Sequence, residues 1–223
     1  MIPFATTQRL ILRAWRDSDK DSIFTALNDP RVAHGISGEL VPQSDTGWER
    51  LKIDLDKTFM VLVIEIKKEY LYMRGHDPNE IEDELEPEVE RREKRKFVGM
   101  VTLDQTQAKN RNTELGIFLA FAWWSKGLGT EVLQWLLKYN FETLGMHRMT
   151  LHAYGDNMNA IELYKHLGYV EEGRMREAVT HEGAWIDVVI MSMLDREWQA
   201  AKTRPIDLSK FEDVVVSTIF RLG

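Results

Sequence analysis

Alternation of apolar and polar residues along the chain predicts a series of β-strands. Each segment repeats with a period of two or is rich in β-branched and aromatic residues, as half-buried strands are. The predicted strands cover residues 9–16, 58–67, 97–106, 113–119, 148–154, 169–178 and 184–194. In the first of them, Leu10, Leu12 and Ala14 are expected on one face.

Apolar residues three and four positions apart predict helices between the strands. One helix ends at Pro30, a less regular one follows Ser44, and two clearer patterns cover residues 129–144 and 157–167. Residues 32–44 contain two glycines and a proline and are expected to form a loop. The succession of strands and helices predicts a mixed α/β domain.

Two segments depart from this pattern. Residues 68–96 are dominated first by acidic and then by basic side chains, which predicts a solvated insertion between two strands, with a docking segment for a partner as the alternative. Residues 199–223 are expected to form a C-terminal tail after a single domain over residues 1–198. The tail carries the apolar run VVVSTIF, which needs a partner surface, on its own domain or on another chain.

Composition narrows the function further. The 223 residues can bury the core of one domain, and the absence of cysteine excludes a disulfide, a thiolate metal site and a cysteine nucleophile. The net charge of −7 argues against general nucleic-acid binding and favours a cationic partner such as an amine. His34 and His181 show no metal-ligand spacing, so no metal is expected. A cytoplasmic protein without a signal peptide or membrane span is expected.

The most informative motif is a glycine turn between a strand and a helix. The apolar run that ends at Trp124 is followed by the sequence SKGLG at residues 125–129, and then by the long helical pattern. Glycines let the backbone approach a ligand, and the first N–H groups of a helix can bind an anion. A dinucleotide fingerprint is excluded because Val132 stands where a third glycine is required, and a P-loop is excluded because Gly129-Thr130-Glu131 is not Gly-Lys-Ser/Thr.

The turn resembles the cofactor motif of the GNAT acetyltransferase superfamily, Gln/Arg-x-x-Gly-x-Gly/Ala. Trp124 departs from the first position, and this departure is similar to the RimJ/RimL-type branch. A second family motif, Asn-x-x-Ala-x-x-x-Tyr-x-x-x-Gly-Phe/Tyr, is matched by Asn157, Ala160, Tyr164, Gly168 and Tyr169. The resemblance covers most of the domain and implies a mostly antiparallel central sheet, flanked by helices and splayed at the cofactor site.

The same resemblance implies acetyl-CoA as co-substrate. Its pyrophosphate would lie on the N–H groups of the turn, where Lys126 adds positive charge. Its pantetheine arm would pair with the preceding strand, opened by a bulge, and the N–H of Phe118 or Leu119 would polarise the acetyl carbonyl. The implied cofactor-binding residues are Ile117, Phe118, Leu119, Ser125, Lys126, Gly127, Leu128, Gly129, Thr130, Asn157, Ala160 and Tyr164.

The reaction implied by the resemblance is direct acetyl transfer to a primary amine. Tyr164 is the candidate general acid for the departing thiolate, and Glu114 is the candidate base, acting through water. His152 is a second candidate base. Each has a plainer interpretation, as a core tyrosine, a surface carboxylate and a structural histidine.

Two functions stay open at this point. The first is an N-acetyltransferase acting on a protein N-terminus or on a small amine. The second is a catalytically silent acyl-CoA-binding or scaffold protein, which the retention of both the glycine turn and Tyr164 disfavours. The apolar tail is compatible with a homodimer.

Overall fold

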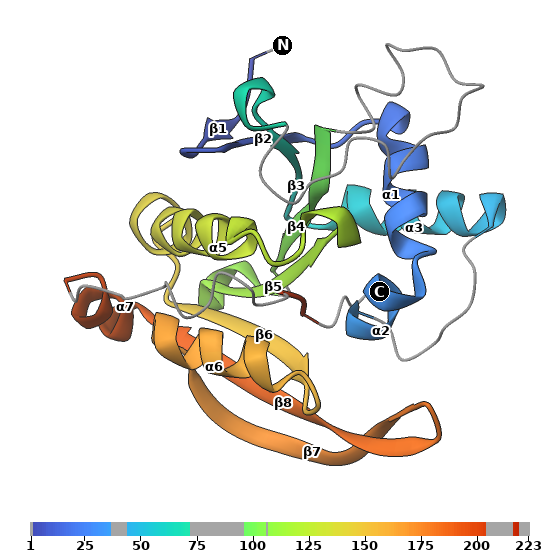
Figure 1. Ribbon diagram of the computed structural model, residues 1–223. Coiled ribbons are helices and arrows are strands. Elements are labelled where there is room, and N and C mark those ends of the chain that lie inside the picture. Colours follow the sequence, from blue (N-terminus) through green and yellow to red (C-terminus); the bar gives the residue numbers. More distant parts are fainter. Residues whose placement is uncertain (1, 37–43, 72–95, 106, 204–215, 219–223) are drawn as a thin grey trace.

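The computed structural model describes residues 2–36, 44–71, 96–105, 107–203 and 216–218 (Figure 1). Within these residues, eight strands form one sheet in the order β1-β2-β3-β4-β5-β6-β8-β7. The strands are β1 (Ala5–Thr6), β2 (Leu10–Ala14), β3 (Met60–Ile66), β4 (Phe97–Asp104), β5 (Asn112–Leu119), β6 (Arg148–Tyr154), β7 (Val170–His181) and β8 (Ala184–Leu194). All neighbours pair antiparallel except β5 and β6, which are parallel. The predicted mixed, mostly antiparallel sheet is confirmed.

Helices cover both faces of this sheet. They are α1 (Lys20–Leu27), α2 (Pro30–Ile36), α3 (Asp45–Lys57), α5 (Leu128–Lys138), α6 (Met158–Leu167) and α7 (Asp195–Ala201). Helices α5 and α6 pack on one face with Leu115 and Ile117 of β5, whereas α1, α2 and α3 pack on the other face with Phe118. The two groups of helices lie on opposite sides of β4 and β5 in Figure 1. Consecutive residues of β5 therefore serve two different cores, as a strand's period of two requires.

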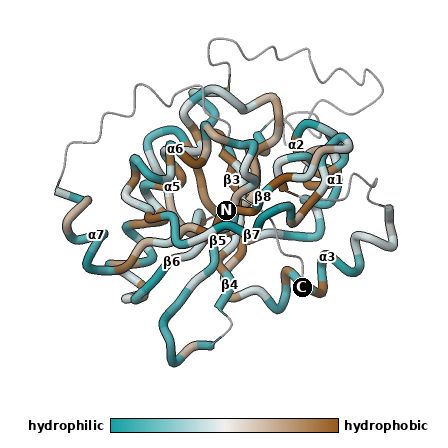
Figure 2. Tube along the Cα trace, turned by 90° about the horizontal axis from the view of Figure 1, so that it is seen from below, coloured by the Kyte–Doolittle hydropathy of each residue, from teal (hydrophilic) through white to brown (hydrophobic). Residues whose placement is uncertain are grey.

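Burial follows the apolar pattern most closely in the central strands. Leu10, Leu12 and Ala14 lie on one face of β2, as predicted, with Leu10 and Leu12 fully buried and Ala14 exposed where the strand ends. Figure 2 shows apolar residues gathered in the central strands and the outer strand β7 largely hydrophilic. A strand at the edge of a sheet has one neighbour, which leaves most of its side chains in water.

The helical predictions needed two corrections. Pro30 does end α1, but it also begins α2, so residues 32–36 of the expected loop are helical. Proline is favoured at the first position of a helix because its missing N–H is not needed there. The helix after Ser44 is confirmed, and the Ser44 hydroxyl accepts a hydrogen bond from Gly47 at its start. The helix predicted over residues 129–144 is α-helical only as far as Lys138, and a π-helical turn, Tyr139–Thr143, follows it.

The insertion and the tail are described only in part. Residues 72–95 of the predicted insertion lie outside the described residues, and so do residues 37–43 of the expected loop. Helix α7 crosses the predicted domain boundary, and residues 216–218 pack inside the fold. Among the helices that the structure describes, none combines the length and the apolar character that crossing a membrane requires.

Candidate active site

The sheet opens between β5 and β6. Their parallel pairing stops after three positions, the last of which joins Glu114 to Thr150. Beyond that point β5 stays paired with β4 as far as Leu119, while β6 stays paired with β8 as far as Tyr154. We call the resulting gap between the two strands the fork. It is the predicted splay of the sheet.

The predicted cause of the splay was wrong. Strand β5 pairs with β4 in unbroken register from Glu114 to Leu119, so β5 contains no bulge in its pairing with β4. The irregularity lies one strand away, where Val98 of β4 has no partner between the pairs formed by Phe97 and Gly99 with β3. Where the fork opens, each strand keeps its other neighbour, β4 for β5 and β8 for β6.

The backbone of β5 presents polar groups to the fork. The N–H and C=O of Ile117 both form hydrogen bonds with Thr218, which lies in the fork. Backbone groups of alternate residues in a strand point to the same side. The N–H of Leu119 therefore faces the fork, and that of Phe118 faces β4. Of the two predicted donors to an acetyl carbonyl, this geometry favours Leu119.

The glycine turn, residues 125–130, leads from β5 into α5. Ser125 and Gly127 have positive φ angles of 55° and 66°, and the first helical hydrogen bond runs from the N–H of Glu131 to Gly127. The three preceding N–H groups, residues 128–130, thus receive no partner from within the helix. The Thr130 hydroxyl is buried and has no hydrogen-bond partner in the part of the chain that the structure describes. A turn with these donors fits the predicted pyrophosphate.

Arg9 holds this turn, and sequence reasoning missed it. Its guanidinium donates to the carbonyl oxygens of Lys126 at 2.8 Å and Gly127 at 3.1 Å, and to Glu131 at 2.6 Å. These contacts turn the carbonyl groups toward Arg9 and add a positive charge beside the N–H groups. Because the partners are more than 115 positions apart in the sequence, the pairing cannot be found from one chain alone.

We expect Arg9→Gln to weaken acetyl-CoA binding about tenfold, because the turn loses both its clamp and a nearby charge. It should also lower the free energy of unfolding by about 2–3 kcal/mol, since Glu131 is left partly buried without its partner. Calorimetric titration and thermal unfolding measure the two effects. Arg174→Gln removes an exposed ion pair with Glu171 on β7 and is the matched control, with no change in binding expected.

The contacts of the Trp124 side chain give a reason for its difference from the family motif. Its indole N–H donates to the carbonyl of Leu119 at 2.8 Å, and its ring meets Phe121 edge to face at 5.2 Å. The tryptophan thereby ties the end of β5 to the start of the turn. We therefore interpret Trp124 as a packing residue.

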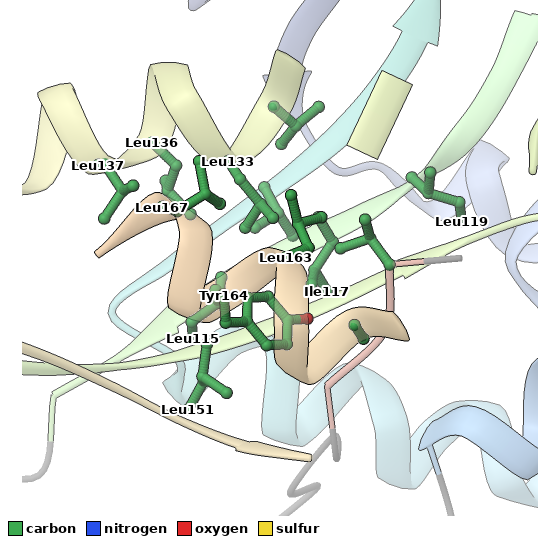
Figure 3. Packing of buried hydrophobic residues seen from close by; sticks show 14 of the residues in the cluster. Leu115, Ile117, Leu119, Leu133, Leu136, Leu137, Leu151, Leu163, Tyr164 and Leu167 are labelled. Carbon is green, nitrogen blue, oxygen red and sulfur yellow. The ribbon is translucent and has the colours of Figure 1, made fainter. Parts of the chain in front are cut away.

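Tyr164 points its hydroxyl at the fork from α6. The side chain is fully buried, and the hydroxyl donates to the carbonyl of Ser217 at 2.9 Å. Figure 3 shows the ring among leucines of β5, α5 and α6, with its oxygen toward Ile117. Burial, with a smaller contribution from Tyr169, raises the pKa of Tyr164 well above its ordinary value, so the hydroxyl stays protonated and can donate.

Asn157 acts at the start of the same helix. Its side-chain oxygen accepts from the N–H of Ala160 at 3.2 Å, which caps α6, and its amide N–H donates to the Ser217 hydroxyl at 3.2 Å. The cap fixes the helix that carries Tyr164. The second motif thus brings Asn157, Ala160 and Tyr164 to one side of the fork, together with Ile117.

Glu114 and His152 lie on the opposite side of the sheet. They face each other from β5 and β6, with the His152 Nδ1 atom 3.0 Å from the Glu114 carboxylate. His152 is buried, and Glu114 is partly exposed beside a cavity of about 310 Å³ that Asp104 and Thr150 also line. The structure joins the two candidate bases into one pair, which the sequence could not show.

A second polar cluster lies on the same side of the sheet. His34 Nε2 and His181 Nδ1 lie 3.5 Å and 3.1 Å from one carboxylate oxygen of Asp156, so these three groups could hold a metal ion that the sequence spacing did not predict. Tyr154 meets the His181 ring edge to face at 4.4 Å. Burial, and then the charge of Asp156, raises the pKa of Tyr154 to about 12.

The fork itself is filled. Residues 216–218, which we call the tail segment, run between β5 and α6 and appear as the short red stretch beside β5 in Figure 1. A cavity of about 430 Å³ lies elsewhere, between α1 and the turn Phe121–Trp123. Nothing in the sequence indicated that the tail enters the predicted cofactor site.

Comparison with known proteins gives the family. A family model described as the acetyltransferase (GNAT) domain matches residues 9–170. The uncharacterized N-acetyltransferase YoaA of Bacillus subtilis is 25% identical over 194 residues, which are 87% of this chain and 98% of YoaA. The putative ribosomal N-acetyltransferase YdaF of the same species is 32% identical over 104 residues, which are 47% of this chain and 57% of YdaF.

A solved structure supports the same assignment at the level of the fold. The structure of spermidine N-acetyltransferase from Vibrio cholerae in complex with CoA and spermine has a TM-score of 0.67 and 23% sequence identity, over 86% of this chain and 98% of that one. The family model spans well over half of the chain, from β2 to the first residue of β7. The chain therefore belongs to the GNAT acetyltransferase family and is an acetyl-CoA-dependent N-acetyltransferase.

Proposed function

We propose that the fork is the acetyl-transfer site and that the acceptor is a small cationic amine. The observation that carries the proposal is the arrangement around β5. A backbone able to pair with an extended amide chain and the Tyr164 hydroxyl lie on one side, and the Glu114–His152 pair lies on the other. When bound, acetyl-CoA supplies an activated acyl group on a thiolate leaving group.

The residues of the chain have separate roles in this proposal. The turn at residues 125–130 binds the pyrophosphate, and Ile117 pairs with the pantetheine arm. The Leu119 N–H polarises the acetyl carbonyl, and the Tyr164 hydroxyl is placed to give a proton to the sulfur. Glu114, oriented by His152, takes a proton from the acceptor amine through water. Phe118 was predicted to bind the cofactor, but in this proposal it packs in the core with α1, α2 and α3 instead.

A cationic acceptor suits the side of the sheet that it would approach. Glu114 and Asp156 carry carboxylates there, and the whole chain has a net charge of −7. An exposed carboxylate attracts an ammonium group and holds it near the fork. The Vibrio cholerae relative was solved with spermine, a small amine with several positive charges.

Peptide N-termini are the competing acceptors, as the description of YdaF as a ribosomal N-acetyltransferase and the RimJ/RimL-type resemblance suggest. The two acceptor classes are separated by measuring thiol release from acetyl-CoA with spermidine, spermine and a set of short peptides. The chain contains no cysteine, so the thiol assay has no protein background. Turnover with polyamines and little with peptides supports the proposal, and the reverse order replaces the small amine by a protein N-terminus.

We expect Glu114→Gln to lower kcat/KM about tenfold near neutral pH, because the amide cannot accept a proton. The loss should shrink as the pH rises, since a growing fraction of the acceptor is then already deprotonated. Asp104→Asn is the matched control, because Asp104 pairs with Glu114 across the strands and lines the same cavity. An equal loss in both variants, or a loss that is independent of pH, would remove Glu114 from the role of base.

A further inference from the structure

The tail segment makes its contacts with residues that are assigned to acetyl-CoA. Thr218 donates its backbone N–H to the carbonyl of Ile117 at 3.1 Å. Its hydroxyl accepts the Ile117 N–H at 2.9 Å and donates to the carbonyl of Leu115 at 3.1 Å. The segment thus adds to β5 in the way that an extended amide chain does.

The neighbouring residues of the segment reach the rest of the same site. The Ser217 carbonyl accepts the Tyr164 hydroxyl, and the Ser217 hydroxyl accepts the Asn157 amide N–H. Val216 lies against Gly129 at the glycine turn, where an added Cβ would come within 2.6 Å of its side chain. All three tail residues are at least nine-tenths buried.

The path of the segment crosses the sheet. Val216 contacts the start of α5 on one face, whereas the Ser217 hydroxyl would lie 2.7 Å from a Cβ added at Gly35 of α2 on the other. Glycine at both positions leaves room for the segment to pass. On its way the segment passes the glycine turn, Ile117 and Tyr164, which are the groups proposed above to bind the cofactor.

We infer that the tail segment is an internal competitor of acetyl-CoA, which must leave the fork before the cofactor can bind. Two chains cannot use the Ile117 N–H and C=O or occupy the face of Gly129 at the same time. The apparent affinity for the cofactor is then the intrinsic affinity reduced by the fraction of molecules with an open fork. The inference rests on the proposed site, since a cofactor bound elsewhere would leave the segment in place.

A single introduced thiol tests the displacement directly. Because the chain has no cysteine, Ser217→Cys carries one thiol, at a side chain only 5% exposed. We expect a disulfide reagent to modify this thiol slowly in the free protein. When the protein is saturated with desulfo-CoA, a CoA analogue that lacks a thiol, the rate of modification should rise at least tenfold. Ser192→Cys, at a serine 2% exposed on β8, is the matched control and should keep one slow rate.

A second variant tests the competition. Thr218→Val keeps the shape but loses both hydroxyl contacts with β5, so the closed state is weakened and desulfo-CoA should bind about tenfold more tightly. Thr203→Val, at an exposed threonine that follows α7, should bind as the wild type does.

The outcomes separate the inference from the proposed function. Faster reaction at Ser217→Cys together with tighter binding by Thr218→Val supports the competitor. Calorimetric binding of desulfo-CoA with an unchanged thiol rate, or weaker binding by Thr218→Val, overturns the competitor and leaves the proposed function standing. If neither the wild type nor Thr218→Val binds desulfo-CoA, the proposed site falls and the competitor falls with it.

Discussion

Gly127→Glu should weaken acetyl-CoA binding more than a hundredfold, a change of about 2.7 kcal/mol in binding free energy or more. Gly127 lies at the start of α5 and has a φ angle of +66°, which residues with a Cβ rarely adopt. The substitution strains the turn and places a carboxylate where the N–H groups would meet a pyrophosphate. The glutamate also approaches Arg9, whose guanidinium would lie 3.4 Å from the new Cβ, and so diverts the charge that holds the turn.

Gly145→Glu is the control for this variant. Gly145 has a φ angle of +62°, and no atom of the described residues lies within 4 Å of an added Cβ, so Gly145→Glu repeats the strain and the charge away from the fork. Calorimetry with both variants, after confirming that they unfold at similar temperatures, isolates the effect of position. Equal binding by the two glutamate variants would show that the glycine turn does not hold the cofactor.

Tyr164→Phe should reduce kcat by about two to three orders of magnitude and leave the dissociation constant of acetyl-CoA within a fewfold of the wild type. Phenylalanine keeps the packing with α5 and β5 but cannot donate a proton. The buried hydroxyl of Tyr164 donates its hydrogen bond to the Ser217 carbonyl of the tail segment and not to a group of the core.

Tyr169→Phe is a demanding control, because Tyr169 is buried beside Tyr164 with its ring centroid 5.8 Å away. Its hydroxyl has no hydrogen-bond partner among the described residues, so its removal should change neither kcat nor KM. Steady-state kinetics with a fixed acceptor distinguishes the two tyrosines. A similar kcat in Tyr164→Phe and the wild type would assign the proton to another donor, such as water.

The elements with regular patterns could be predicted from the sequence almost to the residue. Strand β6 and strand β8 were predicted with the bounds that the structure gives, because each is an apolar-rich run bounded by residues that favour turns. Helix α2 was missed because Pro30 indicates the end of one helix and permits the start of another. Strand β1 has two residues, too few for any period to appear.

The candidate site was predictable only where residues close in sequence form a motif. The turn at residues 125–130 and the row from Asn157 to Tyr164 each lie within one local element, so their spacing carried the information. Arg9, the Glu114–His152 pair and the tail segment join distant parts of the chain, at separations from 38 to more than 100 residues. These contacts depend on the order of the strands in the sheet and on the fork, and neither can be predicted from a single sequence.

The most direct test of the account is a crystal structure of the protein with CoA. We predict the phosphates at residues 126–130, the pantetheine arm bonded to the backbone of Ile117, and the sulfur beside the Tyr164 hydroxyl, with the tail segment displaced. CoA in the cavity between α1 and the turn Phe121–Trp123, with Thr218 still bonded to Ile117, would contradict the proposed site.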